Sequence, residues 1–263
     1  MKLKPIGAFV TFALLLAACG GDSVEVAPDE AMLQITSEGG FVPVDVALGS
    51  GPRFTLLGDG TLIYPGVTTL EFPGRLVPPY FEAHLGRDQM KAVMAMMDDI
   101  GLPNIVDELD DTANQFVADA STDVVTYWDE NGRHRYAVYA LGIQDAPSER
   151  NVAFAELIDT LDRFSTGGIG DPYEPERVRV LAVASTTIGS DGSDVRPWPL
   201  DTEWDQWQSD VNGWHCRVFG GEILESFDDA TQITTWDVPA DVFASNPVSL
   251  LVRPLHPGEP DCP

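Results

Sequence analysis

Two apolar runs separated by a tight-turn sequence predict a β-hairpin early in the chain. The runs are residues 53–57 and 61–64, and residues 58–60 between them read Gly-Asp-Gly. Asp-Gly between apolar runs favours a tight turn because both residues tolerate positive φ. A helix is expected over 88–100, with Gly101 as its stop signal. Its apolar stripe consists of Met90, Val93, Met94, Met97 and Ile100.

The same order of elements recurs further along the chain. Apolar runs at 123–128 and 134–141 flank the turn-forming residues 129–132, and they predict a second hairpin. Ser148 is a candidate N-cap for a helix that continues to about Phe164. The apolar stripe of this helix contains Phe154, Ile158 and Leu161.

Two hairpins that each lead to a helix define an α+β fold class. We expect residues 31–168 to form an antiparallel sheet built from two hairpin–helix units, with both helices on one face. A Gly- and Pro-rich stretch at 165–176 ends this domain. Residues 176–263 are then a smaller strand-rich region, which either folds on its own or packs against the first unit as one domain. Its expected elements are strands at 177–184, 216–219, 232–236 and 248–252 and a short helix at 221–227.

The C-terminal region contains a cysteine pair that predicts one disulfide. Cys216 and Cys262 remain as an even pair once Cys19 is set aside. Such pairs usually oxidise outside the cytoplasm, and this bridge would stabilise the fold by about 4 kcal/mol in the chain-entropy model. The alternatives are two free thiols or a metal site. A metal site needs three or four ligands at workable spacing, and the sequence contains no CxxC or HxxxH.

The first eighteen residues have the make-up of an export signal. Lys2 and Lys4 give a positive start, and the apolar stretch 6–18 follows them. This stretch is too short to span a bilayer, which takes about 20 apolar residues. No later stretch of the sequence is long and apolar enough to span one either. We therefore expect residues 1–18 to be a signal peptide.

The signal ends in the sequence Leu-Ala-Ala-Cys at 16–19. This resembles the lipobox of bacterial lipoproteins, which is an aliphatic residue, a small residue, Gly or Ala, and Cys. The resemblance covers residues 1–19 and implies that the Cys19 sulfur carries diacylglycerol and that the chain is cut just before it. Two acyl chains at one residue are enough for stable anchoring. The membrane is then a partner through lipid, at its extracytoplasmic face, and residues 19–30 form a flexible tether. The alternative is an ordinary signal peptide followed by a chance cysteine.

The composition makes the chain strongly acidic. It has 15 Lys and Arg residues against 42 Asp and Glu residues, a formal net charge of −27. Removal of residues 1–18 takes away two basic residues and no acidic one, so the mature net charge is −29. A field of this sign repels phosphates and anionic lipid headgroups, so nucleic acid is not an expected partner. The charge favours solubility in a salty exterior, or attraction of cations or of a basic protein.

Sequence motifs of known chemistry are absent. There is no GxSxG, SxxK or HExxH, no P-loop and no dinucleotide fingerprint. The sequence therefore assigns no catalytic residue, no metal ligand and no cofactor. An acidic stretch at 107–111 either holds a hard cation or is solvated. The four histidines, at unrelated spacings, are His84, His134, His215 and His256.

Four tryptophans lie close together in the C-terminal region. They are Trp198, Trp204, Trp207 and Trp214, and acidic residues are interleaved with them. Tryptophan beside carboxylates can stack on a sugar or on a cationic ligand. The same rings can instead fill the core of a small domain, because large aromatic side chains dominate core burial. These four residues are the candidate ligand-binding residues, with a glycan, a basic protein or a cation as the candidate partner.

Three short motifs extend the resemblance to the rest of the chain. They are GDGT at 58–61, VYALG at 138–142 and VRPLHPGEPDC at 252–262. They are similar to segments of uncharacterised envelope lipoproteins of high-GC Gram-positive bacteria. This resemblance implies the lipid anchor and no particular activity. Three functions are therefore expected as alternatives: a lipid-anchored binding or interaction module, an envelope hydrolase with an unrecognised active site, and an acidic cation-binding surface protein.

Overall fold

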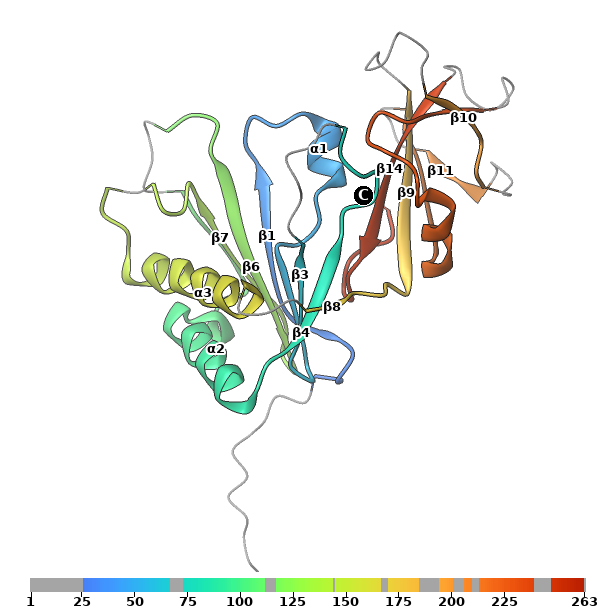
Figure 1. Cartoon of the computed structure of the whole chain (residues 1–263). Coiled ribbons are helices and arrows are strands. Elements are labelled where there is room, and N and C mark those ends of the chain that lie inside the picture. The colour runs from blue at the N-terminus through green and yellow to red at the C-terminus, as the bar shows by residue number, and fades with distance from the viewer. Residues whose placement is uncertain are drawn as a thin grey trace, which may run out of the picture.

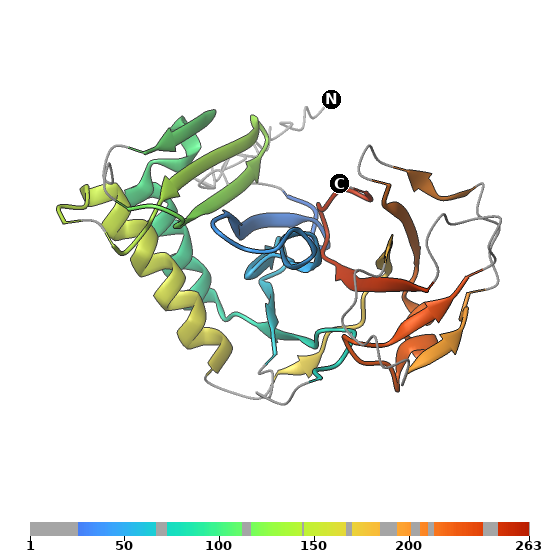
Figure 2. The same cartoon turned by 90° about the horizontal axis from the view of Figure 1, so that it is seen from above.

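The chain forms an α+β fold with two β-sheets, seen here in a computed structural model (Figure 1). The two long helices cover one face of the first sheet. The second sheet lies on the other side of the first sheet from these helices (Figures 1 and 2). The structure describes residues 26–66, 73–111, 117–143, 145–166, 170–184, 194–200, 206–209, 213–238 and 247–262.

The first sheet is mixed. Its strands are β1 (Ala31–Gly39), β2 (Phe54–Leu57), β3 (Thr61–Pro65), β4 (Tyr80–His84), β5 (Asp107–Asp110), β6 (Ser121–Asp129), β7 (Gly132–Tyr139) and β8 (Asp171–Pro172). Among the described residues their order is β5-β7-β6-β1-β2-β3-β4-β8. The β5–β7 pair is parallel, whereas β1 pairs antiparallel with both β6 and β2. The expectation of an antiparallel sheet is therefore wrong at this edge. The sequence hides β5 because that strand is acidic and lacks apolar alternation.

Two long helices lie side by side on the first sheet (Figures 1 and 2). They are α2 (Arg87–Ile100) and α3 (Glu149–Thr166), at the positions predicted from apolar spacing. Gly101 ends α2 with φ of 78°, a left-handed conformation that favours glycine. The backbone N–H of Asn151 donates to Ser148 Oγ at 3.2 Å, which confirms Ser148 as the N-cap of α3. The short helical turns are α1 (Val44–Gly49), η1 (Leu102–Asn104) and η3 (Gly221–Phe227).

The arrangement differs from two hairpin–helix units in one respect. The strands β2 and β3 pair as expected, but the chain then adds β4 before α2 begins. The strand β4 pairs with β8, the edge strand of this sheet. The chain continues from β8 into β9 of the second sheet. No helix within the described ranges is both long enough and apolar enough to cross a bilayer.

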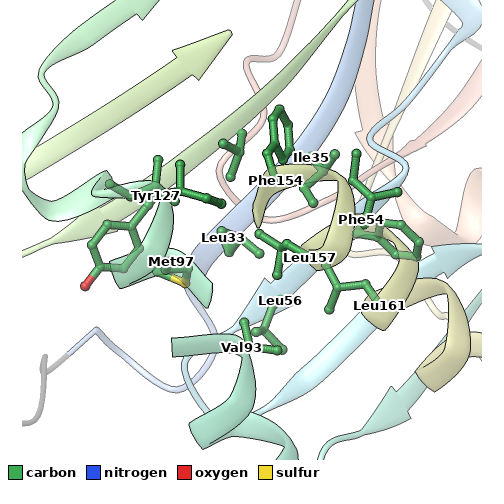
Figure 3. Packing of buried hydrophobic residues seen from close by; sticks show 14 of the residues in the cluster. Leu33, Ile35, Phe54, Leu56, Val93, Met97, Tyr127, Phe154, Leu157 and Leu161 are labelled. Carbon is green, nitrogen blue, oxygen red and sulfur yellow. The ribbon is translucent and has the colours of Figure 1, made fainter. Parts of the chain in front are cut away.

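The main core lies between the first sheet and the two long helices. Figure 3 shows strand residues of this core meeting side chains of α2 and α3. Leu33 and Leu56 are fully buried, and so are Leu157 and Leu161 on α3. Truncating such a leucine to alanine typically costs about 2–5 kcal/mol, because lost transfer energy is added to a cavity. Further residues of this core labelled in Figure 3 are Ile35, Phe54, Val93, Met97, Tyr127 and Phe154.

The second sheet is also mixed and carries the disulfide. Its strands are β9 (Arg177–Ala184), β10 (Val195–Pro197), β11 (Gln208–Ser209), β12 (His215–Gly220), β13 (Thr235–Asp237) and β14 (Val248–Leu255). In the part of the chain that is described, their order is β10-β13-β14-β9-β12-β11, and β10 pairs parallel with β13. Cys216 on β12 is bonded to Cys262, with Cα atoms 5.9 Å apart, so the predicted disulfide is confirmed.

The segment between β3 and β4 connects the two sheets. Leu76 from this segment is buried in the core of the second sheet. Its backbone N–H donates to Ala230 O at 3.0 Å, and the N–H of Gln232 donates to Gly74 O at the same distance. The segment before β4 therefore contributes a core side chain to the second sheet and backbone hydrogen bonds to the loop that follows η3.

Candidate functional site

A buried polar cluster joins the two sheets where β14 ends. Arg253 on β14 lies 2.9 Å from the carboxylate of Glu259, and these side chains are only 4% and 10% exposed. The backbone N–H of His256 donates to the same carboxylate at 2.8 Å. Removing one partner of a buried ion pair costs about 3–5 kcal/mol, because the other charge is left unpaired. We name this cluster the polar joint; its members are Arg253, His256, Glu259, Thr55, Tyr80 and Tyr173.

His256 is the fully buried centre of the polar joint. Its Nδ1 lies 2.8 Å from the hydroxyl of Thr55 on β2. The rings of Tyr80 and Tyr173 meet it edge-on, with centroids 4.6 and 5.5 Å away. Burial, together with the positive charge of Arg253, lowers the pKa of His256 to about 3. The imidazole is therefore neutral, and it links β14 to residues of the first sheet without adding a further positive charge beside the buried arginine.

A second buried arginine lies directly opposite Arg253. Arg179 on β9 pairs with Arg253 across the β9–β14 ladder, and burial together with this neighbouring charge lowers its pKa to about 10. Its guanidinium donates to the carbonyl oxygens of Asp261 at 2.8 Å and Pro260 at 2.7 Å. The tail at 256–262 is therefore held by Arg253, by Arg179 and by Arg177, which pairs with Asp261, as well as by the disulfide.

A cavity of about 310 Å³ opens beside the polar joint, between the two sheets. Tyr80 and Tyr173 of the polar joint also line this cavity. Its volume is at the lower end of small-molecule sites, which span about 300–1,000 Å³. We name it the junction groove. Its lining residues are Arg75, Val77, Pro78, Pro79, Tyr80, Phe81, Pro172, Tyr173, Leu224, Phe227, Asp228, Ala230 and Pro254.

The lining of the junction groove is mostly apolar, with charge only at the rim. Tyr80 and Phe227 are among the buried lining residues, whereas Arg75 and Asp228 are exposed. Burial raises the pKa of Tyr80, and burial with nearby Glu259 raises the pKa of Tyr173 to about 12. Both phenols are therefore neutral near neutral pH. Such a surface suits binding of an apolar ligand through shape and two rim charges.

Backbone contacts fix the walls of the junction groove. The N–H of Gly66 donates to Pro79 O at 2.8 Å, and the N–H of Tyr173 donates to Tyr80 O at 3.0 Å. Gly66 is needed because a Cβ there would collide with the ring of Phe81. The prolines before β4 fix φ and keep this approach to the strand stiff. The walls of the groove are therefore tied together by backbone hydrogen bonds.

The predicted tryptophan site is located elsewhere. Trp207 is 6% exposed, and its ring centroid lies 5.8 Å from those of Trp198 and Phe219. Trp198 is partly buried against the same core, and Trp214 is partly exposed. None of these three described tryptophans lines the junction groove. Trp204 and Cys19 lie outside the described residues.

The other histidines have local partners. His134 Nδ1 lies 2.6 Å from Ile105 O and its Nε2 lies 2.9 Å from Asp129, so both nitrogens face acceptors. Burial opposes charge on this ring, but these hydrogen bonds outweigh it and raise the pKa of His134. His215 Nδ1 lies 3.0 Å from the Ser209 hydroxyl, and His84 is exposed.

The acidic stretch at 107–111 is engaged by neighbouring side chains. Asp107 pairs with Arg135 at 3.2 Å, and Glu108 pairs with Arg150 at 2.8 Å. Arg150 also donates to Ile100 O at 3.0 Å, so these contacts tie the edge strand β5 to both helices. Among the residues with described positions, no group of three or more His, Cys, Asp or Glu side chains is arranged to hold a metal ion.

Sequence reasoning missed the junction groove because its residues are far apart along the chain. The local signal is a proline next to an aromatic residue, which occurs at Pro79-Tyr80 and again at Pro172-Tyr173. These pairs meet because β4 and β8 are neighbouring strands, with Phe81 opposite Pro172. The two-residue strand β8 carries no periodic pattern that would have revealed this pairing.

Comparisons of the chain with models of known protein families, with curated proteins and with solved structures found no match. Function is therefore inferred from the junction groove, the polar joint and the sequence of the N-terminus.

Replacing His256 with asparagine tests the neutral, buried state of this ring. Its folded pKa of about 3 lies below the unfolded value of 6.5, so the unfolded chain binds the proton first as the pH falls. The free energy of unfolding should then drop by an extra ~1.4 kcal/mol per pH unit below pH 6.5. The His256→Asn variant keeps an amide near Thr55 and should lack this extra slope. Urea unfolding at pH 7, 6 and 5 measures it, and equal slopes in the two proteins would contradict a neutral His256.

Proposed function

We propose that this chain is a lipid-anchored binding module on the extracytoplasmic face of the cell membrane, and that its ligand occupies the junction groove. The mostly apolar groove between the two sheets is the observation that carries this proposal. The lipobox pattern at 16–19 supports the anchor. The ionisable lining side chains are one Arg, one Asp and two Tyr, which favours binding over the hydrolase alternative.

The acidity of the chain supports a lipid anchor in place of surface attachment. The net charge of −29 on the mature chain is unfavourable for contact with anionic lipid headgroups. Two acyl chains on Cys19 would overcome this repulsion, because each buried methylene contributes about 0.8 kcal/mol.

The attachment of the tether leaves the junction groove accessible. Residues 28–30 bond to the β2–β3 turn, with Asp59 N–H donating to Pro28 O at 3.0 Å and Gly58 N–H to Glu30 O at 3.1 Å. The groove lies at the other end of β3, where Pro65 pairs with Tyr80. The two ends of this strand are about 13 Å apart at 3.3 Å per residue. An anchored molecule would therefore present the groove away from its point of attachment.

Replacing Cys19 with alanine should release the protein from the membrane. Wild-type protein is expected in the membrane fraction, with a mature mass that begins at Cys19 and includes diacylglycerol. Cys19→Ala should move to the soluble fraction, whereas the neighbouring Ser23→Ala variant should stay with the membrane. Fractionation and intact-mass measurement test this. A Cys19→Ala protein that still partitions with membranes would contradict a lipid anchor on Cys19.

Filling the junction groove should abolish ligand binding without unfolding the protein. Leu224 lines the groove on η3 and is half-buried, whereas the adjacent Glu225 is exposed and outside the lining. A panel of small compounds is screened by ligand-observed NMR. It includes peptides with apolar side chains, acyl chains, and glycosides with apolar aglycones. Leu224→Trp should weaken each hit at least tenfold, and Glu225→Trp should leave it unchanged. The melting temperature of each variant is measured beside its binding, because Leu224 also packs against the core of the second sheet. The proposed function would be refuted if the affinity of the hits is the same for Leu224→Trp as for the wild type, or if no compound of the panel binds.

A further inference from the structure

The two charged residues on the rim of the junction groove form no ion pair with any residue that the structure describes. Arg75 and Asp228 both line the groove and are exposed, and neither forms an ion pair with a described residue. Nearby arginines are paired: Arg177 with Asp261, and Arg253 with Glu259. A cation and an anion, each without an ion pair to the described part of the chain, therefore border one apolar cavity.

The positions of these charges come from different parts of the chain and are fixed by the backbone. Arg75 precedes β4 and forms an antiparallel bridge with Thr231, just beyond the loop that follows η3. Asp228 is the residue directly after η3, and the following N–H of Ala230 donates to Phe227 O at 2.9 Å. Arg75 is thus bridged to the same short loop, between η3 and Thr231, that carries Asp228, and Phe227 and Ala230 of this part of the chain also line the groove.

We propose that the junction groove binds a short peptide with free termini and apolar side chains. Its carboxylate pairs with Arg75, its ammonium group pairs with Asp228, and its side chains lie over Tyr80 and Phe227. This inference depends on the proposed function, because it names the ligand class of the same groove. The volume of about 310 Å³ admits only a short peptide, parts of which can project from the open side of the groove.

Charge complementarity selects this ligand over other apolar ones. An acyl chain with an acidic head would satisfy Arg75 but would meet Asp228 and the acidic field of the chain. A purely cationic ligand would satisfy Asp228 but would meet Arg75. A zwitterion pairs with both charges at once. Proline and aromatic lining residues suit peptide side chains and proline rings, which stack on aromatic faces at low entropic cost.

The tripeptide Leu-Pro-Phe is a suitable probe, compared with its N-acetyl form and its C-terminal amide. Titration against the mature wild-type protein at neutral pH should show that blocking either terminus weakens binding by up to about fivefold, the upper end of the range expected for solvent-exposed ion pairs. Arg75→Gln should remove the effect of amidation and keep the effect of acetylation. Asp228→Asn should do the reverse.

Two exposed charges outside the lining provide matched controls. Arg133→Gln and Asp229→Asn should keep the full response to both blocking groups. Blocked and free peptides that bind equally, or rim variants that keep both effects, would overturn the peptide inference. If other apolar ligands bind in a Leu224→Trp-sensitive manner while the tripeptide does not bind, the inference fails and the proposed function stands. If no ligand class binds, both fail.

Discussion

The buried ion pair between Arg253 and Glu259 is the constraint on which the arrangement of the two sheets depends. A guanidinium with 4% exposure needs a carboxylate, and the tail after β14 turns back to supply it. The same carboxylate accepts the N–H of His256, which places that ring against Thr55 of the first sheet. A buried ion pair adds little net stability compared with apolar packing, but it fixes geometry because each partner is costly alone. These contacts thereby fix the position of the tail relative to both sheets.

This arrangement of the tail and the two sheets also forms the junction groove. Tyr80 and Tyr173 contact His256 on one side and line the cavity on the other. The hydroxyl of Tyr173 donates to Leu255 O at 3.1 Å, so the groove wall is bonded to the end of β14. Gly51 permits this close approach, because a Cβ there would collide with the Tyr80 hydroxyl and the Arg253 guanidinium. Groove and joint therefore share their aromatic residues, and a ligand site at the junction follows from how the sheets meet.

Local patterns predicted the elements that depend on near neighbours. The helices α2 and α3 followed from apolar spacing and stop signals, and the cysteine count indicated the Cys216–Cys262 bond. The alternation of Leu33 and Ile35 with polar neighbours would have revealed β1, but it lies next to the expected tether. What the sequence could not show is non-local. Arg253 and His256 gave no sign of burial, and the aromatic residues of the groove meet only after β4 and β8 pair. The sequence instead indicated a ligand site at the tryptophans, one of which, Trp207, is a core residue of the second sheet.

Native-state hydrogen exchange on the Glu259→Gln variant tests most directly whether the polar joint holds the sheets together. Loss of one partner of this ion pair should cost about 3–5 kcal/mol. Backbone amides in β2, β4 and β14 should then lose protection together, by a factor of about one hundred or more. Protection lost only in the tail at 256–262, with β2 and β4 unchanged, would show that the two sheets are held by other contacts.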